Sequence, residues 1–345
     1  METQKNEYQV KKTAIVILNW NGRSLLQQFL PSVVLNTPAE QADIMVADNG
    51  STDDSIVFLR KHYPQIRIIL LEQNYGFAAG YNKALEQVNH EYLVLLNTDV
   101  EVTPGWLSTA LDYLDSHPET AALQPKLLSY HNRRQFEYAG AGGGFIDRYG
   151  YPFCRGRIFS VLEDDECQYD KEEEVLWASG ACLFIRNRIF KEAGGFDPFF
   201  FAHQEEIDLC WRLRNQGHSI VCLPSSVVYH VGGATLAMEH PHKIFLNFRN
   251  NLVLLYKNLP EKEYRRTKRV RWFADRLAAF VFLCKGAPEN AWSIFRARRA
   301  FNQYRKKHPE LRVAAILPTT LPEQVYKKSL LVAYYLRGKK RFSQL

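Results

Sequence analysis

Residues 13–18 read Thr-Ala-Ile-Val-Ile-Leu, a continuous apolar run rich in β-branched side chains. Such a run predicts a strand that is buried on both faces. Comparable runs follow at 43–48, 66–71 and 92–96. The helical patterns between these runs cover 24–35, 55–62 and 78–88. This alternation predicts an α/β fold with an open, mostly parallel sheet and helices on both faces.

Polar residues stand where three of these strands end. Asn19 follows the first strand, Asp48 ends the second and Asp99 follows the fourth. In an open α/β sheet the ligand binds beyond the carboxyl ends of the strands. We therefore expect these three side chains to converge on one edge of the sheet and to line a ligand site.

The pattern of alternating elements weakens between residues 124 and 170. This stretch contains the glycine-rich segment 140–144 and the acidic run 163–166, and we expect it to be a mobile excursion from the core. Regular structure is expected to return at 175–185, followed by a helix over 205–216 and a strand over 219–223.

Charge divides the chain into two parts. Residues 243–345 carry 24 Lys and Arg against 6 Asp and Glu, whereas the preceding residues carry 20 against 31. The basic part reads as helical to its end, with breaks near Pro260, Pro288 and Pro309. We therefore expect a larger domain over 1–240 and a basic helical region over 241–345.

Composition and motif content exclude several classes of protein. Of the 345 residues, 46% are hydrophobic and 23% are charged, which excludes wholesale disorder. The six cysteines form neither a CxxC pair nor a zinc-ligand spacing, and the amino terminus lacks the apolar core of a signal peptide. The longest apolar run, 277–284, is too short for a hydrocarbon core that needs about 20 residues. We expect a cytosolic protein with reduced thiols and no transmembrane helix.

Two loops carry residues suited to a nucleoside diphosphate. In Asp48-Asn-Gly-Ser-Thr-Asp53 the first carboxylate can accept from an N–H of a nucleobase. The alternative is a structural turn in which Asp53 caps the next helix. In the second loop, Gly76 and Gly80 permit close backbone approach, and the helix that begins there would turn its N–H groups outward to a diphosphate. Ordinary helix packing explains the same glycines.

Asp99 is the candidate metal ligand. It follows a buried strand, a standard place for an oxygen ligand of Mg²⁺ or Mn²⁺, and Asn97 is an auxiliary ligand. The alternative is an ordinary turn at the end of the strand. His230 lies at the end of a further predicted strand, where a lone histidine is more often a packed core residue than a ligand.

Glu205 and Glu206 form an adjacent pair of carboxylates beside aromatic residues. Burial and like charge in such a pair hold one pKa near the working pH, as a general base requires. The alternative is that both carboxylates mark the start of a helix, where negative charge is favoured. In the same segment, Asp208 and Arg212 have the spacing of an ion pair on a helix surface.

Taken in order, these segments resemble the family 2 inverting glycosyltransferases with a GT-A fold, particularly the rhamnosyltransferase-like branch. The resemblance extends from Thr13 to about Thr235. The matching motifs are Ile-Leu-Asn-Trp-Asn (17–21), Asp-Asn-Gly-Ser-Thr-Asp (48–53), Asn-x-Gly-Phe-Ala-x-Gly-x-Asn (74–82), Leu-Asn-x-Asp (96–99), Ser-Gly-Ala (179–181), Phe-Asp-x-x-Phe-Phe (196–201), Glu-Glu-Ile-Asp-Leu-Cys-Trp-Arg (205–212) and His-x-x-Gly (230–233).

The resemblance implies a donor site made by residues from several strand ends. Asn19 and Asp48 would line the nucleoside pocket, with Asp48 facing the base. Gly76 and Asn82 would face the diphosphate or the donor sugar. Asn97, which stands where many relatives have an Asp, would also border the donor.

The resemblance also assigns the metal, the base and the acceptor side. Asp99 and His230 would hold a divalent metal, Mg²⁺ or Mn²⁺. Glu206 occupies the position of the catalytic base, and Glu205 is the alternative base. The residues implied to border the acceptor are Trp177, Ser179, Gly180 and Ala181.

The implied reaction is a single displacement at the anomeric carbon of a nucleotide sugar, with inversion. Glu206 would remove the proton of the acceptor hydroxyl while the metal neutralises the departing nucleoside diphosphate. The implied acceptor is a glycan or a lipid-linked sugar, in the synthesis of a cell-surface polysaccharide at the cytoplasmic face of a membrane. Trp272 and Phe273 stand among basic residues, which favours an anionic membrane surface over nucleic acid as the partner of 241–345.

Two other classes of protein stay open at this point. A nucleotidyltransferase also places a metal-binding carboxylate after a buried strand, but the segment 76–80 lacks the basic residue of an early phosphate loop. A non-catalytic protein that binds sugars or nucleic acid explains the basic region. It does not explain the combination of Asp99, Glu206 and His230.

Overall fold

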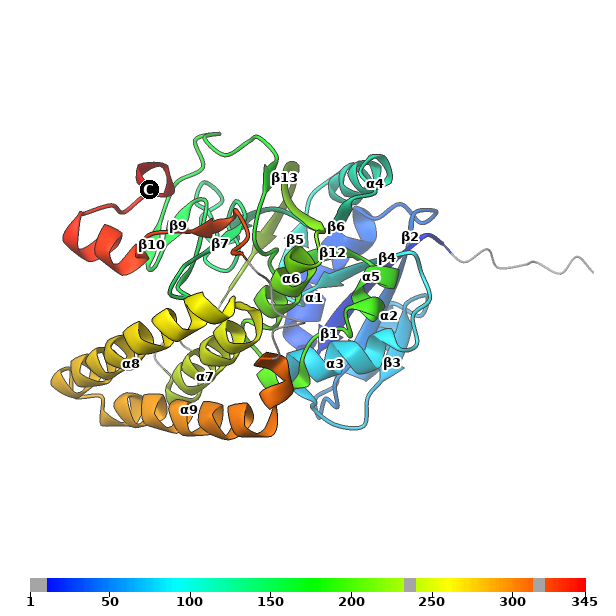
Figure 1. Cartoon of the computed structure of the whole chain (residues 1–345). Helices are drawn as coiled ribbons and strands as arrows, with labels where there is room; N and C mark the ends of the chain where they lie inside the picture. Colours follow the sequence, from blue (N-terminus) through cyan, green and yellow to red (C-terminus); the bar gives the residue numbers. More distant parts are fainter. Residues whose placement is uncertain (1–10, 233–239, 313–319) are drawn as a thin grey trace, which may run out of the picture.

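The computed structural model describes residues 11–232, 240–312 and 320–345 (Figure 1). Its main sheet is made by β1 (Thr13–Asn19), β2 (Ala42–Asp48), β3 (Arg67–Leu70), β4 (Tyr92–Leu96), β5 (Val100–Val102), β6 (Thr120–Ser129), β11 (Glu173–Glu174), β12 (Cys182–Arg186) and β13 (Ser219–His230). The strand order is β11-β13-β6-β12-β4-β1-β2-β3, and β5 pairs with β13. Neighbours among β1 to β4 are parallel, whereas β12 is antiparallel to β4 and β6. The predicted α/β fold with a mostly parallel sheet is confirmed.

Helices cover both faces of this sheet, as the sequence predicted. They are α1 (Arg23–Leu35), α2 (Ser55–His62), α3 (Gly76–Leu85), α4 (Trp106–Ser116), α5 (Asn187–Glu192) and α6 (Glu205–Asn215). The alternating side chains of β1 show how the two faces are filled. Ala14 and Val16 pack in one core with α3, α5 and α6, while Ile15 and Ile17 pack in the other with α1, α2 and α4. A strand with both faces covered has no place for polar side chains before its end, which is why the first polar side chain after this run is Asn19.

A second, smaller sheet occupies the stretch that was expected to be a mobile excursion. It contains β7 (Gly144–Asp147), β8 (Pro152–Cys154), β9 (Arg157–Ile158), β10 (Val161–Leu162) and β14 (Val325–Tyr326) in the order β10-β9-β8-β7-β14. The expectation of a mobile excursion is wrong, because this stretch is packed. Phe136 and Ala141 have no exposed surface, and the bare backbone of Gly144 lies against the indole of Trp177.

The carboxyl-terminal part is helical in α7 (Pro241–Asn258), α8 (Glu261–Cys284) and α9 (Pro288–Lys307), with breaks at the prolines that predicted them. The expectation that this part is helical to its end is wrong. After residue 320 the chain returns to the small sheet as β14, where Leu330 N–H donates to the buried carboxylate of Asp147 at 2.8 Å. The small sheet is therefore completed by a strand from the far end of the chain.

Helix α7 is tied to α6 through the carboxylate of Asp208, whose side chain has no exposed surface. Arg212 Nε donates to Asp208 at 2.9 Å, Lys257 Nζ at 2.8 Å and Asn258 Nδ2 at 2.9 Å. Burial alone would raise the pKa of Asp208, but the charges of Lys257 and Arg212 outweigh it and lower the pKa. The predicted pair of Asp208 and Arg212 exists, although it is buried rather than on the helix surface.

Removing a cation from this buried group should destabilise the protein strongly. Lys257 donates to both Asp208 and Asp197, so Lys257→Ala removes one donor from each carboxylate. We expect the free energy of unfolding to fall by about 3–5 kcal/mol. The measurement is urea unfolding followed by circular dichroism. Arg265→Ala is the control because Arg265 forms only an exposed pair with Glu261, and it should lose less than about 1 kcal/mol. Equal losses in the two variants would contradict the structural role of Lys257.

Candidate functional site

The ends of β1 and β2 bring Asn19 and Asp48 together. The two residues are partners in the parallel register, and Asn19 Nδ2 donates to Asp48 Oδ1 at 3.0 Å. Asp48 Oδ2 accepts from Ser51 N–H at 3.0 Å, inside the tight turn that follows β2. Asp53 accepts from the N–H of Ser55 at 3.1 Å, at the start of α2, but the residue at the cap position of this helix is Asp54 and not Asp53. The turn is thus internally bonded, and Asp48 lies 2% exposed at its base.

Asn49 is a residue of this site that the sequence analysis did not single out. Its Nδ2 donates to Asn74 Oδ1 at 3.1 Å and to the carbonyl of Gly76 at 3.0 Å, and its Oδ1 accepts from Tyr75 N–H at 3.0 Å. One buried amide therefore fixes the turn after β2 against the loop that enters α3. Only its position next to Asp48 could have drawn attention to it.

The first turn of α3 does not offer all of its N–H groups to a ligand. The N–H groups of Phe77 and Ala78 donate to the carbonyl of Phe201 at 2.7 and 3.1 Å. The expectation that these groups face a diphosphate is therefore wrong for Phe77 and Ala78, because the loop before α6 caps the helix. Gly76 has a φ of +76°, and a Cβ there would lie 2.5 Å from the Phe201 ring. Only glycine at position 76 allows Phe201 to lie this close to the backbone.

The side chain of Asn82 makes hydrogen bonds within the protein. Its Nδ2 donates to the carbonyl of Phe196 at 2.7 Å, and its Oδ1 accepts from Phe196 N–H at 3.0 Å. Both polar atoms of the amide are taken up by one residue of the backbone. In the structure the Asn82 amide therefore holds the backbone of Phe196, in the segment that leads to α6. Its contact with the nucleotide-sugar donor stays a prediction.

Asn97, Asp99 and His230 converge at the end of β4. Antiparallel pairing of β5 with β13 places His230 opposite Val100, next to Asp99. His230 Nε2 lies 3.2 Å from Asp99 Oδ1 and 3.4 Å from Asn97 Nδ2. Asp99 is 6% exposed and His230 5%. The sequence separation of Asp99 and His230 gives no hint of this contact, which depends on the sheet.

Glu137 completes this cluster and was not anticipated from the sequence. Its Oε1 lies 3.3 Å from His230 Nδ1, and the carboxylate is 3% exposed. Burial would lower the pKa of His230, but Glu137 and Asp99 outweigh it and raise the pKa to about 10. Burial would likewise raise the pKa of Asp99, yet the hydrogen bond and charge of His230 lower it. Glu137 lies in a loop without a motif, so no sequence signal marked it.

The donor set of this cluster fits a divalent metal. In the described ranges, no three His, Cys, Asp or Glu side chains are already arranged as a metal centre. His230 Nε2 nevertheless faces the carboxylate of Asp99, and a carboxylate oxygen beside an imidazole nitrogen is a donor pair of the kind that binds Mn²⁺. The other nitrogen faces Glu137, and a carboxylate in that position commonly orients a metal-binding histidine.

The two glutamates at the start of α6 differ in exposure. Glu205 is 4% exposed, whereas Glu206 keeps part of its side chain at the surface. In each, Oε2 is buried with no hydrogen-bond partner among the described residues. Burial, and then the charge of Glu206, raise the pKa of Glu205 well above its ordinary value. Burial raises the pKa of Glu206 to about 7. Glu206 is therefore the carboxylate able to exchange a proton near neutral pH.

Gly180, in the segment 179–181, lies beside Glu206. A Cβ placed on Gly180 would lie 3.8 Å from the Cβ of Glu206 and 3.2 Å from the ring of Phe77. Trp177, Ser179 and Ala181 are 2–4% exposed, and their acceptor contacts stay a prediction. Trp177 donates to the carbonyl of Phe145 at 2.9 Å, and Ser179 Oγ donates to the carbonyl of Ala139.

Asn250, from α7, fixes the loop that leads into α6. Its Nδ2 donates to the carbonyls of Phe200, Ala202 and His203 at 3.0, 2.8 and 2.7 Å. Three residues of this loop have positive φ, namely Phe201 (63°), His203 (70°) and Gln204 (70°). Non-glycine residues rarely adopt this conformation, so the loop needs outside support. A residue outside the motif-bearing region therefore positions Glu205 and Glu206.

Comparisons with known proteins agree with this geometry. The sequence profile of Glycosyl transferase family 2 matches residues 14–194, more than half of the chain. An N-acetylglucosaminyl-diphospho-decaprenol L-rhamnosyltransferase of Mycobacterium tuberculosis is 28% identical over 232 residues, which cover 63% of this chain and 75% of that protein. The rhamnosyltransferase WbbL of Escherichia coli is 25% identical over 265 residues, covering 72% and 92%.

A solved structure shares the fold. The crystal structure of GalNAc-T7 with UDP, GalNAc and Mn²⁺ superposes with a TM-score of 0.58 at 15% identity. The match covers 75% of this chain and 50% of that one, so the present chain spans half of that protein. At this identity the likeness concerns the fold, which is the GT-A fold with a helical region added at α7 to α9.

The close approach of Gly76 to Phe201 can be tested against a glycine of the same conformation. Gly105 has a φ of +77°, and nothing lies within 4 Å of a Cβ placed there. Gly76→Ala and Gly105→Ala should both lose about 1–2 kcal/mol from the left-handed backbone. Gly76→Ala should lose a further 1–3 kcal/mol or so, because its methyl group displaces Phe201. Urea unfolding measures both, and equal losses would contradict the contact.

Proposed function

The chain belongs to Glycosyl transferase family 2 and is a glycosyltransferase, and from that premise we propose its mechanism and setting. It transfers a sugar from a nucleoside diphosphate to a hydroxyl group of a glycan or lipid-linked acceptor, by a single displacement that inverts the anomeric carbon. The observation that carries this proposal is the position of Glu206. This carboxylate belongs to the first turn of α6, is partly exposed and has a pKa of about 7. It lies beside Gly180, which also approaches the ring of Phe77 at the start of α3.

Glu206 is the general base in this proposal. An acceptor hydroxyl is a weak nucleophile, and attack on the anomeric carbon requires that its proton leaves as the new bond forms. A base with a pKa near 7 is about half deprotonated at neutral pH and still binds the proton well. Glu205 is 4% exposed and lies too deeply to meet an acceptor, and burial together with the charge of Glu206 raises its pKa. We therefore infer that Glu205 supports Glu206 and does not replace it.

Asn19, Asp48 and the turn that follows form the nucleoside end of the donor site. Asp99 and His230 would hold a divalent metal, Mg²⁺ or Mn²⁺, with Asn97 beside them and Glu137 orienting the histidine. When bound, the metal would neutralise the charge of the departing diphosphate. Mn²⁺ accompanies UDP in the GalNAc-T7 structure.

The setting that we propose is the synthesis of a cell-surface glycan from a lipid-linked acceptor. The name of the mycobacterial relative describes transfer of rhamnose to a sugar diphosphate carried by decaprenol. Among the residues that the structure describes, no helix has the length and apolar composition to cross a bilayer. We propose that α8 and α9 instead hold the enzyme at an anionic membrane surface, on its cytoplasmic face. The nucleotidyltransferase and non-catalytic binding alternatives have no support from the family match.

The role of Glu206 predicts a specific pH dependence. The base must be deprotonated, so the rate of the wild-type enzyme should rise with pH through about 7 and then level off. Glu206→Gln should lower the rate at least about 10²-fold at pH 7 and above, while the binding of the nucleoside diphosphate stays nearly unchanged. The measurement is release of nucleoside diphosphate from a panel of nucleotide sugars.

Glu205→Gln is the matched control for this prediction. It replaces a buried carboxyl group, whose pKa is raised by burial, with an uncharged amide of similar shape, so activity and pH profile should change little. If Glu205→Gln abolished activity while Glu206→Gln retained it, the base would be Glu205. A pH-independent wild-type rate between pH 5 and 9 would also contradict the proposal.

Asp99→Ala should abolish turnover and remove the metal-dependent part of donor binding. The physical reason is that the variant takes away the only ionised oxygen ligand within hydrogen-bond distance of His230 Nε2 among the described residues. Isothermal titration of a nucleoside diphosphate, with and without Mn²⁺, measures this effect. Asp112→Ala, on the exposed face of α4, is the control and should bind like the wild type. Unchanged turnover of Asp99→Ala at saturating donor would remove Asp99 from the metal site.

A further inference from the structure

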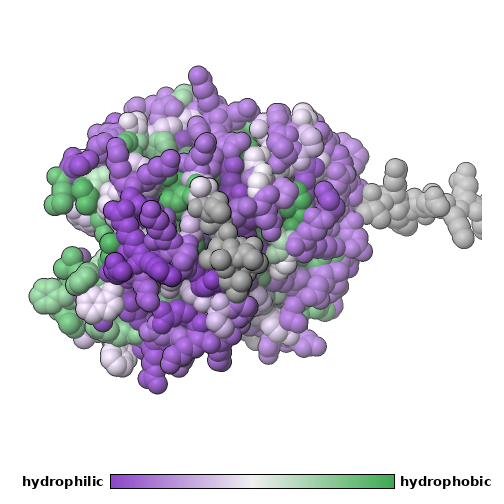
Figure 2. Space-filling view, in the orientation of Figure 1, coloured by the Kyte–Doolittle hydropathy of each residue, from purple (hydrophilic) through white to green (hydrophobic). Residues whose placement is uncertain are grey.

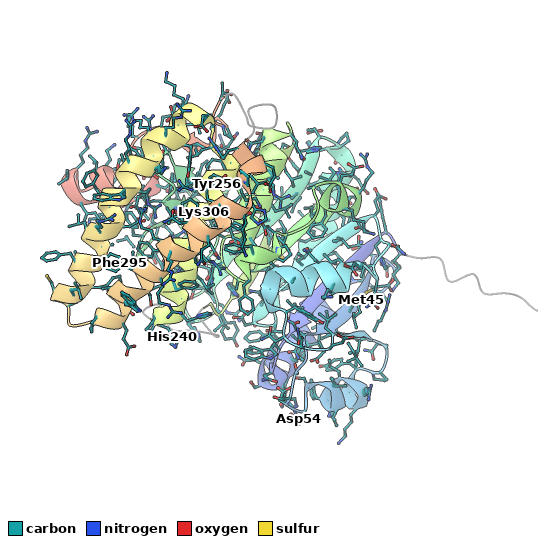
Figure 3. The ribbon with its side chains drawn as sticks, turned by 60° about the horizontal axis from the view of Figure 1, so that its bottom comes forward. Met45, Asp54, His240, Tyr256, Phe295 and Lys306 are labelled. Carbon is teal, nitrogen blue, oxygen red and sulfur yellow. The ribbon has the colours of Figure 1, made fainter. Side chains whose placement is uncertain are left out.

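Helices α8 and α9 form a hairpin with a cleft between them. The cleft has a volume of about 450 Å³, and its cationic lining residues are Arg276, Arg298, Arg299 and Lys306. None of the described residues that line it is acidic. In Figure 3, Phe295 and Lys306 mark two points along α9, with Phe295 toward the free end of the hairpin. The charged side chains that line the cleft are therefore all cationic.

Most of this positive charge is not balanced within the protein. Arg298 donates to Asp275 at 2.8 Å, but Asp275 also accepts from Arg271 at 3.1 Å. Burial lowers the pKa of Arg298 in spite of Asp275. Among the residues that the structure describes, neither Arg299 nor Lys306 forms an ion pair. An anion in the cleft would supply the missing negative charge.

The free end of the hairpin is apolar. Eight large hydrophobic side chains are 43–68% exposed between the middle of α8 and the first half of α9, namely Trp272, Phe273, Leu277, Phe280, Val281, Leu283, Trp292 and Phe295. Figure 2 shows hydrophobic side chains gathered on the side of the molecule where Figure 1 places this end of α8 and α9. An exposed apolar patch of this size marks a surface that meets a partner or a membrane.

Apolar and cationic side chains are interleaved along the hairpin, as in helices that lie at a lipid surface. Phe295 belongs to the apolar end and also lines the cleft, and Arg299 follows it by one helical turn, about 6 Å along α9. Arg276 stacks on Trp272, with its guanidinium carbon 3.4 Å from the ring centroid. Aromatic rings at the level of the acyl boundary, with basic groups just outside them, are typical of interfacial helices. A nucleic acid would offer phosphates to the cleft but nothing apolar to the end of the hairpin.

We propose that the cleft between α8 and α9 binds the phosphate of an anionic phospholipid while the aromatic end of the hairpin enters the acyl boundary of the bilayer. This inference rests on the proposed placement of the enzyme at a membrane. It adds a defined headgroup site to what would otherwise be general attraction between a basic region and an anionic surface. Because α7 joins this hairpin to the loop before α6, the same contact would orient the active site toward the membrane.

The test uses the full chain and vesicles of phosphatidylcholine with and without phosphatidylglycerol, in a sedimentation assay. The cleft variant is Arg299→Ala with Lys306→Ala. The control is Arg266→Ala with Arg269→Ala, which removes the same charge from exposed positions on α8 outside the cleft. We expect wild-type binding only with phosphatidylglycerol, and binding by the cleft variant at least about tenfold weaker than by the control. Hydrolysis of a nucleotide sugar in solution should be the same in all three proteins and shows that they are folded.

Three outcomes would overturn the inference. If the cleft and control variants bind anionic vesicles equally, the cleft is not a headgroup site, although the membrane placement stands. If the wild-type chain hydrolyses a nucleotide sugar but ignores anionic vesicles, the membrane placement and the inference fail together while the enzymatic proposal stands. Tight binding of random duplex DNA by the wild type, lost in the cleft variant, would identify the cleft as a nucleic-acid site.

Discussion

The carboxylate of Asp208 receives a guanidinium, an ammonium and an amide inside the protein, from α6 itself and from α7. An unpaired charge at this depth would cost several kcal/mol, so the two helices must stay together for either to keep its place. Asn250 adds three hydrogen bonds from α7 to the strained loop before α6. The region after residue 240 is therefore part of the scaffold of the active site, and not an attachment that can be cut away without effect.

This scaffold explains how two adjacent glutamates acquire different properties. Glu205 and Glu206 follow a loop whose backbone is held in left-handed conformations by contacts with α7 and α3. The loop turns one carboxylate into the interior and leaves the other partly exposed. Burial raises the pKa of both, and the inner carboxyl also experiences the charge of the outer one. A proton acceptor tuned to neutral pH thus arises from the geometry of the helix start, without any special residue type.

The cluster of Asp99, His230 and Glu137 depends on a different constraint, the pairing of strands. Val100 and His230 are partners across β5 and β13, although 130 positions separate them in the chain. This register brings the imidazole beside Asp99, and the loop that carries Glu137 places a second carboxylate 3.3 Å from His230 Nδ1. At the other end of the molecule, the α8–α9 hairpin exposes aromatic side chains beside unbalanced cations.

The sequence alone determined the α/β layers, since a run such as 13–18 has one way to bury both faces, and it determined the strand ends at Asn19, Asp48 and Asp99. It also pointed to Glu205, Glu206 and His230 as chemical candidates. Only the tertiary structure decided which glutamate is exposed. It also decided that the side chains of Asn82 and Trp177 donate to backbone carbonyls, and that Glu137 and Asn250 lie at the site. The reason is physical. Burial of a strand follows from local residue pattern, whereas exposure, hydrogen-bond partners and pKa depend on segments far apart in the chain.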